Sequence, residues 1–302
     1  MAIMDDEKPR SVLVTGGRGF IGRTLGKLLQ RQRYRVISVD VTPSSDEVVC
    51  DVSDSGALKG LLQRESVDAI IHLAAILPTA AQQHPLLATR VNVQGSVNLL
   101  ELAREFHVQR FIFSSSLSVY GTCPEDQVVM ETDRAAPEDL YGAAKLYVEQ
   151  LGAVYRQTHG LEFVSLRIGR VAGPGARSAT SAWRSEIFER LGSVSAAEIE
   201  IPYSKSERFL LVHVEDVAKM LLALMGAPRL VHGVYNAACE SVTVGELKLE
   251  VERLNPRVSV RLKGQAIGGN PRRVDWSRFA QEFGFVTNPI FEQLARAAST
   301  SD

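Results

Sequence analysis

Short apolar runs alternate with longer segments of helical spacing through the first half of the chain. The runs that predict strands are "SVLV", "YRVISV", "EVVC", "DAIIHLAA", "QRFIFSSS" and "EFVSLRIG". The segments between them that predict helices are "FIGRTLGKLL", "GALKGLLQRE", "HPLLATRVNVQGSVNLLELAREF" and "LYGAAKLYVEQLGAVYRQTHG". Apolar strands separated by helices indicate a parallel sheet covered on both faces. We therefore predict an α/β fold with a doubly wound Rossmann sheet, which binds its ligand at the carboxyl ends of the strands.

The alternation becomes less regular after Gly169. The stretch "GRVAGPGARSATS" is typical of a loop, and "AWRSEIFERL" and "AEIEIPY" predict a helix and a short strand. The stretch "RFLLVHVEDVAKMLLALM" predicts a strand followed by a helix. We predict a dinucleotide-binding domain over residues 1–169, with elements of about 209–238 returning to it. Residues 170–302 are expected to form mainly a smaller, mixed α/β substrate lobe.

Four glycines lie in the turn between the first expected strand and helix, "SVLVTGGRGFIG". Gly17-x-Gly19-x-x-Gly22 has the spacing of a dinucleotide-binding loop, although such a turn can also be only a tight connection. Glycine allows close approach of a ligand, and a helix start favours an anion. Asp40 ends the second expected strand, roughly 20 residues after the glycine loop. At this position a carboxylate can hold the ribose hydroxyls of an adenosine.

Composition and charge narrow the class of protein. The 302 residues are 45% apolar, enough for a full core, and the net charge of −1 gives no strong attraction to nucleic acid or membrane. Cys50, Cys123 and Cys239 are odd in number and far apart, which favours a reducing compartment over disulfides or zinc. The polar N-terminus does not resemble a signal peptide, and the histidines lack metal-ligand spacing. We expect a cytoplasmic protein without a metal.

The stretch "YGAAK" places Tyr141 and Lys145 four residues apart, on one face of an expected helix. A neighbouring ammonium should lower the pKa of Tyr141, which could then exchange a proton with a hydroxyl as a hydride moves. Alone, this spacing indicates no more than packing. Ser114, Ser115 and Ser116 end a preceding strand, where a hydroxyl could bind the reacting oxygen, although they could equally be a plain exit from the strand.

These stretches together resemble the extended short-chain dehydrogenase/reductases, the NAD-dependent epimerase/dehydratase group. The resemblance runs from residue 12 to about residue 285. It is carried by "VLVTGGRGFIG", "SVD", "CDVSD", "HLAA", "VNVQGSVNLLE", "FIFSSSLSVYG", "YGAAK", "RFLLVHVEDVA" and "DWSRFAQEFGF". It implies a Rossmann fold, a nicotinamide cofactor and a sugar or nucleotide-sugar substrate, and it is more specific for the family than for the substrate.

The resemblance also implies roles for individual positions. Those expected to contact the cofactor are Gly16, Gly19, Phe20, Ile21, Gly22, Asp40, Asp51, Val52, Leu73, Ala74, Ala75, Asn92, Tyr141 and Lys145. Ser116 is the expected catalytic serine, because the family's Ser or Thr usually lies about 25 residues before the tyrosine. Arg208 and Arg273 are the candidates for holding a nucleotide-sugar diphosphate, although each could be an ordinary surface arginine.

The chain departs from the family pattern at several positions. Leu117 and Ser118 stand where sugar-nucleotide dehydratases usually carry an Asp-Glu pair, which argues against dehydration. Gly169 and Arg170 replace a bulkier, neutral pair, so the substrate pocket is expected to differ from that of ordinary epimerases. Trp183 is expected to pack inside the lobe rather than to stack on a base.

Two charges bear on the choice of cofactor. Arg18 lies inside the glycine loop and could reach the 2′-phosphate of NADP, whereas the carboxylate of Asp40 would repel that phosphate. A fixed negative charge at the ribose should dominate, so we predict NAD, with NADP left open by Arg18.

Residues and resemblance together predict an NAD-dependent oxidoreductase acting on a sugar or nucleotide-sugar hydroxyl, as an epimerase by transient oxidation and hydride return. Ser116 would orient the reacting oxygen, Tyr141 would act as acid/base, and Lys145 would lower its pKa and hold the nicotinamide ribose. Two alternatives stay open: a sugar or sugar-acid dehydrogenase that releases NADH, and a nucleotide-sensing regulator on the same fold. The sequence does not name the sugar, the nucleotide or the pathway.

Two of the expected helices, at about 85–106 and 140–158, carry apolar residues on more than the one stripe that covers the sheet. Extra apolar surface usually marks an interface. We expect a homodimer formed through these helices, as in the resembled family, unless the substrate lobe or the tail of the same chain covers them.

Overall fold

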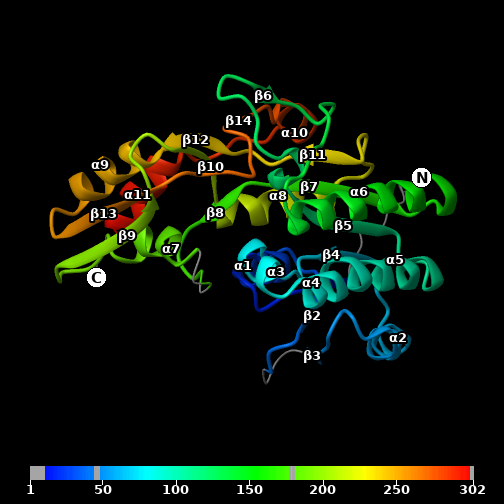
Figure 1. Cartoon of the computed structure of the whole chain (residues 1–302). Coiled ribbons are helices and arrows are strands. Elements are labelled where there is room, and N and C mark those ends of the chain that lie inside the picture. The colour runs from blue at the N-terminus through cyan, green and yellow to red at the C-terminus, as the bar shows by residue number, and fades with distance from the viewer. Residues whose placement is uncertain (1–10, 44–47, 177, 179–180, 300–302) are drawn as a thin grey trace, which may run out of the picture. The chain divides into compact units, whose positions relative to one another are not determined.

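The computed structural model describes residues 11–43, 48–176, 178 and 181–299, which form two compact units. The first unit takes the chain up to Ser116, residues 139–167 and residues 218–235, and the second takes the remainder. Figure 1 labels the elements of both. Within the described residues, no helix is long and apolar enough to cross a membrane.

A seven-stranded sheet forms the centre of the first unit, in the order β11-β7-β5-β4-β1-β2-β3. Its strands are β1 (Ser11–Thr15), β2 (Arg35–Asp40), β3 (Val48–Val49), β4 (Ala69–His72), β5 (Arg110–Ser116), β7 (Glu162–Ile168) and β11 (Val234–Asn236). The inner strand β1 is buried along its whole length and pairs in parallel with β2 and β4. This sheet confirms the predicted α/β fold of the Rossmann type.

The helices of the first unit are α1 (Phe20–Arg31), α2 (Ser55–Arg64), α3 (Pro78–Gln83), α4 (Pro85–Ala88), α5 (Gly95–Glu105), α6 (Leu140–His159) and most of α8 (Val214–Gly226). The sequence marks both ends of α6. The Asp139 carboxylate accepts the main-chain N–H of Gly142 at 2.6 Å, and Gly160 ends the helix with a φ of 69°. The expected helix over about 85–106 has a π-helical segment, Thr89–Gln94, between α4 and α5.

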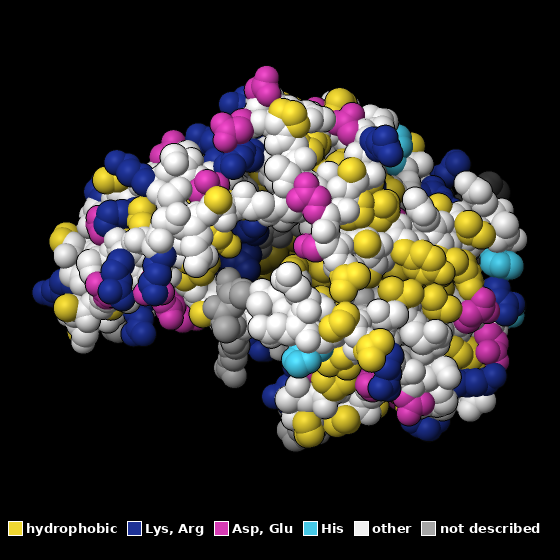
Figure 2. All heavy atoms as spheres, in the orientation of Figure 1, with side chains coloured by type: hydrophobic (Ala, Val, Ile, Leu, Met, Phe, Trp, Pro, Cys, Tyr) yellow, Lys and Arg dark blue, Asp and Glu magenta, His cyan; other side chains and the backbone are white. Residues whose placement is uncertain are grey.

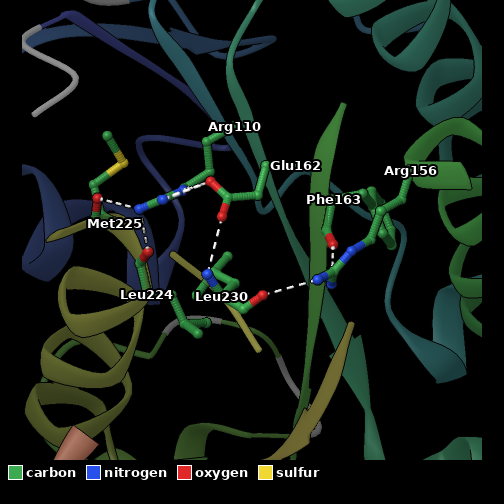
Figure 3. A network of polar contacts seen from close by, with 7 residues as sticks. All are labelled: Arg110, Arg156, Glu162, Phe163, Leu224, Met225 and Leu230. Atoms are coloured by element: carbon green, nitrogen blue, oxygen red, sulfur yellow. Dashed lines mark hydrogen bonds and ion pairs between the residues drawn. The ribbon is translucent and has the colours of Figure 1, made fainter. Parts of the chain in front are cut away.

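A network around Arg110 and Glu162 ties the segment 218–235 to the sheet (Figure 3). Arg110 on β5 forms an ion pair with Glu162 on β7 at 2.5 Å. Arg110 also donates to the main-chain oxygens of Leu224 and Met225, at 2.9 and 2.8 Å, and so satisfies carbonyls at the end of α8. Glu162 accepts the N–H of Leu230 at 2.9 Å. These contacts explain how a segment distant in sequence belongs to the first unit.

The second unit contains smaller sheets and short helices. Its sheets are β12-β10-β8, β13-β9 and β14-β6. The strands are β6 (Val128–Val129), β8 (Arg170–Ala172), β9 (Ala197–Tyr203), β10 (Arg208–His213), β12 (Glu240–Thr243), β13 (Val258–Gln265) and β14 (Arg273–Val274). The helices are a 3₁₀ turn at Leu117–Tyr120, α7 (Ala182–Glu189), α9 (Val244–Leu254), α10 (Ser277–Phe283) and α11 (Ile290–Ser299). Trp183 and Phe209 belong to its apolar core.

Candidate active site

The glycine loop between β1 and α1 brings main-chain segments into close contact. Gly16 has a φ of 68°, and a Cβ atom there would lie 2.8 Å from the main-chain nitrogen of Ala74. A Cβ atom at Gly22 would lie 2.3 Å from the main-chain oxygen of Gly16. The N–H of Gly19 donates to that same oxygen at 2.9 Å. Side chains at Gly16 or Gly22 would displace the main chain, so the turn itself requires these glycines.

The start of α1 has no side-chain cap. Its N-cap residue is Gly19, and the first turn, which includes Phe20 and Ile21, holds no acidic residue. A helix start of this kind presents main-chain N–H groups and the positive end of the helix dipole to an anion. The residues present therefore fit the pyrophosphate of a dinucleotide, and the contacts of Phe20 and Ile21 with it stay predictions.

Asp40 ends β2 with its carboxylate beside the glycine loop. One oxygen accepts the main-chain N–H of Arg18 at 3.2 Å, and the other accepts that of Thr42 at 3.1 Å. The Arg18 guanidinium donates to the main-chain oxygen of Pro43. A fixed carboxylate next to the loop fits the hydroxyls of an adenosine ribose.

The residues expected near the adenine lie between β3 and α2. Asp51 accepts the N–H of Ser53 at 2.8 Å, and the main-chain oxygen of the buried Val52 accepts a hydrogen bond from Asn98 at 3.1 Å. These bonds fix the loop that borders the end of β2.

The loop after β4 is held against β1. The N–H of Leu73 donates to the main-chain oxygen of Thr15 at 3.1 Å, and that of Ala74 donates to the Thr15 hydroxyl at 3.3 Å. Leu73, Ala74 and Ala75 are all partly exposed. They follow the carboxyl end of a central strand, where this fold binds its ligand.

Asn92 lies in the π-helical segment and is buried. Its amide oxygen accepts the N–H of Ile76 at 2.7 Å, and its amide nitrogen donates to the main-chain oxygen of Ile76 at 2.9 Å. Asn92 therefore holds the loop after β4 in place, and a direct contact with the cofactor stays a prediction. Single π-turns within helices often occur at functional sites.

The three serines at the end of β5 differ in their surroundings. Ser114 donates to the main-chain oxygen of His72 at 2.9 Å, and Ser115 donates to the carboxylate of Glu149 at 2.5 Å. Both are buried, whereas Ser116 is partly exposed. This difference favours Ser116 as the serine that meets a substrate.

Tyr141 and Lys145 lie together at the start of α6. The Lys145 nitrogen lies 5.4 Å from the centre of the Tyr141 ring and 4.6 Å from the centre of the Phe113 ring. It donates a hydrogen bond of 2.7 Å to the main-chain oxygen of Ser114, which ties α6 to β5. Burial lowers the pKa of Lys145 to about 7, although the Glu149 carboxylate acts in the opposite direction.

The expected lowering of the Tyr141 pKa by Lys145 is wrong in this structure. Burial raises the pKa of Tyr141 above its usual value, and the Asp139 carboxylate raises it further. Since burial also favours the neutral amine of Lys145, the charge that would stabilise a phenolate is weakened. Both effects favour the neutral phenol form of Tyr141 in the folded chain.

A buried ion pair supports this corner of the sheet and was missed from the sequence. Glu149 on α6 and Arg167 on β7 lie 2.7 Å apart, with side chains 4% and 6% exposed. Glu149 also accepts the Ser115 hydroxyl. In "YGAAKLYVE", Glu149 follows Lys145 by four residues and so shares its helix face, but this spacing does not indicate the contact with Arg167.

His72 links β4 to its neighbours as a neutral side chain. Its two ring nitrogens lie 2.7 Å from the Thr15 hydroxyl and 2.9 Å from the Ser96 hydroxyl. Burial, and secondarily the nearby Lys145, lowers the pKa of His72 to about 3. It is therefore a positioning residue at this end of the sheet.

The two arginines proposed for a diphosphate lie in the second unit. Arg208 begins β10, is partly exposed and donates to the main-chain oxygen of Ser241 at 3.0 Å. Arg273 begins β14 and is exposed. Arg272, next to it, donates to Glu207 at 3.1 Å. Diphosphate binding by Arg208 and Arg273 stays a prediction.

The departures from the family pattern have local explanations. A Cβ atom at Gly169 would lie 2.7 Å from the sulfur of Cys239 and 3.3 Å from a methyl group of Leu117. These two side chains therefore fill the space of a bulkier residue. Trp183 is buried and packs edge-on against Phe209, with ring centres 5.6 Å apart. This confirms that Trp183 is a packing residue.

Comparison with known proteins decides the family. Residues 12–238 match the NAD dependent epimerase/dehydratase family. The chain belongs to this family. It is an enzyme of the NAD-dependent epimerase/dehydrogenase type, in a family that uses NAD(P).

The relatives are divided in activity. The "Uncharacterized UDP-glucose epimerase YtcB" of Bacillus subtilis (strain 168) is 30% identical over 286 residues, covering 86% of this chain and 87% of that protein. The UDP-glucose 4-epimerase of Thermus thermophilus in complex with NAD superposes with a TM-score of 0.81 at 25% identity, covering 96% and 98% of the two chains. The L-threonine dehydrogenase of Phytophthora infestans superposes with a TM-score of 0.87 at 25% identity and the same coverage. Family membership alone therefore does not name the substrate.

Proposed function

We propose that this enzyme oxidises a sugar or nucleotide-sugar hydroxyl with NAD and works as an epimerase, by transient oxidation and hydride return. The observation that carries the proposal is the arrangement at the carboxyl end of β5. Ser116 ends that strand with a partly exposed side chain, and Lys145 binds the main chain of the same strand. Tyr141 lies beside Lys145 on α6.

Each residue has a definite role in this proposal. Bound NAD supplies the hydride acceptor. The Ser116 hydroxyl orients the oxygen of the reacting group, and the Tyr141 hydroxyl exchanges a proton with that oxygen. Lys145 holds the nicotinamide ribose, and its protonated fraction favours the phenolate form of Tyr141 when the proton must be taken up.

NAD rather than NADP is the proposed cofactor. The Asp40 carboxylate is fixed by the N–H groups of Arg18 and Thr42, so it cannot easily turn away from a 2′-phosphate. The Arg18 side chain donates to Pro43, which occupies part of its hydrogen-bonding capacity.

A second candidate is a dehydrogenase with net release of NADH. The likeness to L-threonine dehydrogenases supports it, as do Gly169 and Arg170, where the chain departs from ordinary epimerases. An absorbance assay for NADH across neutral sugars, sugar acids, nucleotide sugars and L-threonine, with product analysis by NMR, separates the two. Epimer formation without NADH supports the epimerase, and accumulating NADH supports the dehydrogenase. Absence of both products with every substrate would contradict the proposed substrate classes.

The proposed assembly is a homodimer formed through residues 85–105 and α6. Several large apolar side chains of these helices are exposed, and hydrophobic side chains gather over α5 and α6 in Figure 2. The exposed large apolar residues within these ranges are Leu86 and Leu87 on α4 and Leu140, Tyr147 and Val154 on α6. The proposed location is the reducing cytoplasm, in keeping with the three free cysteines.

A further inference from the structure

Two arginines of the second unit come together without an acidic partner. Arg170 lies on β8 and Arg184 on α7, and α7 packs against both β8 and β9. The main-chain oxygen of Arg184 accepts the N–H of Gly173 at 3.1 Å, which fixes the start of α7 near the end of β8. Within the part of the chain that the structure describes, no carboxylate forms an ion pair with either guanidinium.

The polar groups around this pair are incompletely satisfied. The Nε atom of Arg184 is buried without a hydrogen-bond partner among the described residues, as is the indole nitrogen of Trp183. Burial lowers the pKa of Arg184 to about 10, and the positive charge of Arg170 contributes to that lowering. Burial lowers the pKa of Arg170, and the nearby Tyr203 side chain on β9 acts in the opposite direction. Both arginine residues nevertheless keep partial exposure to solvent.

The buried arginines among the described residues behave differently. Arg110 and Arg167, which are 4% and 5% exposed, each have a carboxylate partner, Glu162 at 2.5 Å and Glu149 at 2.7 Å. Burying a guanidinium without an opposite charge is costly, and two adjacent positive charges add repulsion. Arg170 and Arg184 therefore differ from the two buried arginines, because no described carboxylate offsets their charges.

We propose that Arg170, Arg184 and Tyr203 form a binding site for the carboxylate or phosphate group of an acidic ligand. A guanidinium offers a planar pair of donors that fits either anion, and the bound charge would offset the repulsion between the two arginines. The Tyr203 hydroxyl adds a neutral donor beside them. Resting on the proposed function, the site assigns an acidic substrate to this enzyme.

The test compares three sugars with one ring and different charges. Glucuronate carries a carboxylate, glucose 6-phosphate carries a phosphate, and glucose is neutral. Thermal shift and calorimetry of the full-length protein should show binding of at least one acidic sugar about tenfold or more tighter than that of glucose. Tighter binding of glucuronate would identify the anion as a carboxylate, and tighter binding of glucose 6-phosphate would identify it as a phosphate. Equal affinity for the three sugars, or binding of none of them at millimolar concentration, would overturn the proposal.

Matched variants locate the site. Arg170→Gln and Arg184→Gln should each weaken binding of the acidic sugar by about tenfold or more, while Arg190→Gln, an exposed arginine at the end of the same helix, should leave it unchanged. NAD affinity, measured on each variant, reports that the protein is folded. Unchanged binding of the acidic sugar in both variants would contradict the assignment.

The melting temperature without sugar separates ligand binding from a structural role. Because each glutamine variant removes an unpaired charge, its melting temperature should equal or exceed that of the wild type. A large fall would indicate that the arginines serve the fold instead. If the variants do not fold, the comparison of the three sugars on the wild type still decides the proposal. These binding measurements need no turnover. They can therefore contradict the anion site while NAD-dependent oxidation is still observed, and they can support the anion site where no oxidation is observed.

Discussion

The side-chain nitrogen of Lys145 lies 5.4 Å from the centre of the Tyr141 ring, over its face. Its hydrogen bond goes to the main-chain oxygen of Ser114. Lys145 is thereby fixed to the strand that ends at Ser116, and this link joins the three proposed catalytic positions in one local structure. The geometry allows their roles to be tested separately.

Tyr141→Phe removes the proposed proton donor and keeps the ring that packs beside Lys145. General acid–base catalysis is typically worth 10²–10⁴-fold, so we expect a loss of kcat of about that size with little change in NAD affinity. Steady-state kinetics on an active substrate and calorimetry with NAD measure the two effects. Tyr147→Phe, on an exposed tyrosine of the same helix, is the control and should keep full activity. Turnover of Tyr141→Phe at the parental rate would show that another group transfers the proton.

Lys145 should make the stability of the folded protein depend on pH. Its pKa is about 7 in the folded chain against an ordinary value of 10.5. Between these values the unfolded chain holds a proton that the folded chain has lost, so the contribution of Lys145 to the free energy of unfolding increases as pH rises from about 7 to 10.5. Lys145→Met lacks this contribution, and its melting temperature should fall relative to the wild type as pH rises through the window.

The control for this experiment is Lys27→Met, on an exposed lysine of α1. Its melting temperature should run parallel to that of the wild type across the same range. If the difference between Lys145→Met and the wild type does not change with pH, Lys145 is charged in the folded protein at neutral pH.

Asp40 should control the choice between NAD and NADP. Its carboxylate is held by the N–H groups of Arg18 and Thr42, so it repels a 2′-phosphate. The wild type should bind NAD more tightly than NADP. The Asp40→Asn variant should lower the ratio of NAD affinity to NADP affinity by about tenfold or more, which corresponds to about 1.4 kcal/mol of binding free energy. Calorimetric titration with both dinucleotides measures this ratio. Asp126→Asn removes an exposed acid elsewhere and should leave the ratio unchanged. Equal or tighter binding of NADP by the wild type would contradict this prediction and would indicate that Arg18 determines the choice of cofactor by binding the 2′-phosphate.

The fold could be predicted from the sequence where apolar periodicity is strong and local. The strands around β1 and the helices α1, α2 and α6 follow directly from such runs. The π-helical segment at Thr89–Gln94 did not follow, because its apolar pattern continues that of the flanking α-helices. The main-chain approach between Gly16 and Ala74 also joins residues far apart in sequence, which only the packed sheet brings together.

Some residues of the candidate site could be proposed from the sequence, and others could not. Ser116, Tyr141 and Lys145 could be proposed because each stands at a fixed place relative to a strand end or a helix start. The pKa of Tyr141 was predicted in the wrong direction, because the sequence shows the neighbouring lysine but not the burial that outweighs it. The pair Glu149 and Arg167 depends on contact between a helix and a strand, which spacing alone does not give.

The exposed apolar surface of residues 85–105 and α6 predicts a dimer. On α6, Val148 and Tyr155 are buried against the sheet, whereas Tyr147 and Val154 are each 49% exposed. A second apolar stripe of this kind is costly in water and is removed when two copies pair by a two-fold axis. Light scattering at micromolar concentration should therefore give a particle near twice the chain mass of 33.1 kDa.

Val154→Glu places a charge on that stripe and should shift the particle towards the mass of a single chain, with the circular dichroism spectrum unchanged. Leu249→Glu, on the exposed face of α9 in the second unit, is the matched control, because Leu249 is 62% exposed but lies outside the proposed interface. It should leave the dimer intact. A wild-type particle of 33.1 kDa whose mass does not increase with protein concentration would reject the dimer. The apolar stripe of α6 would then have to contact a partner other than a second copy of this chain. A dimer that survives Val154→Glu would place the interface on a different surface of the chain.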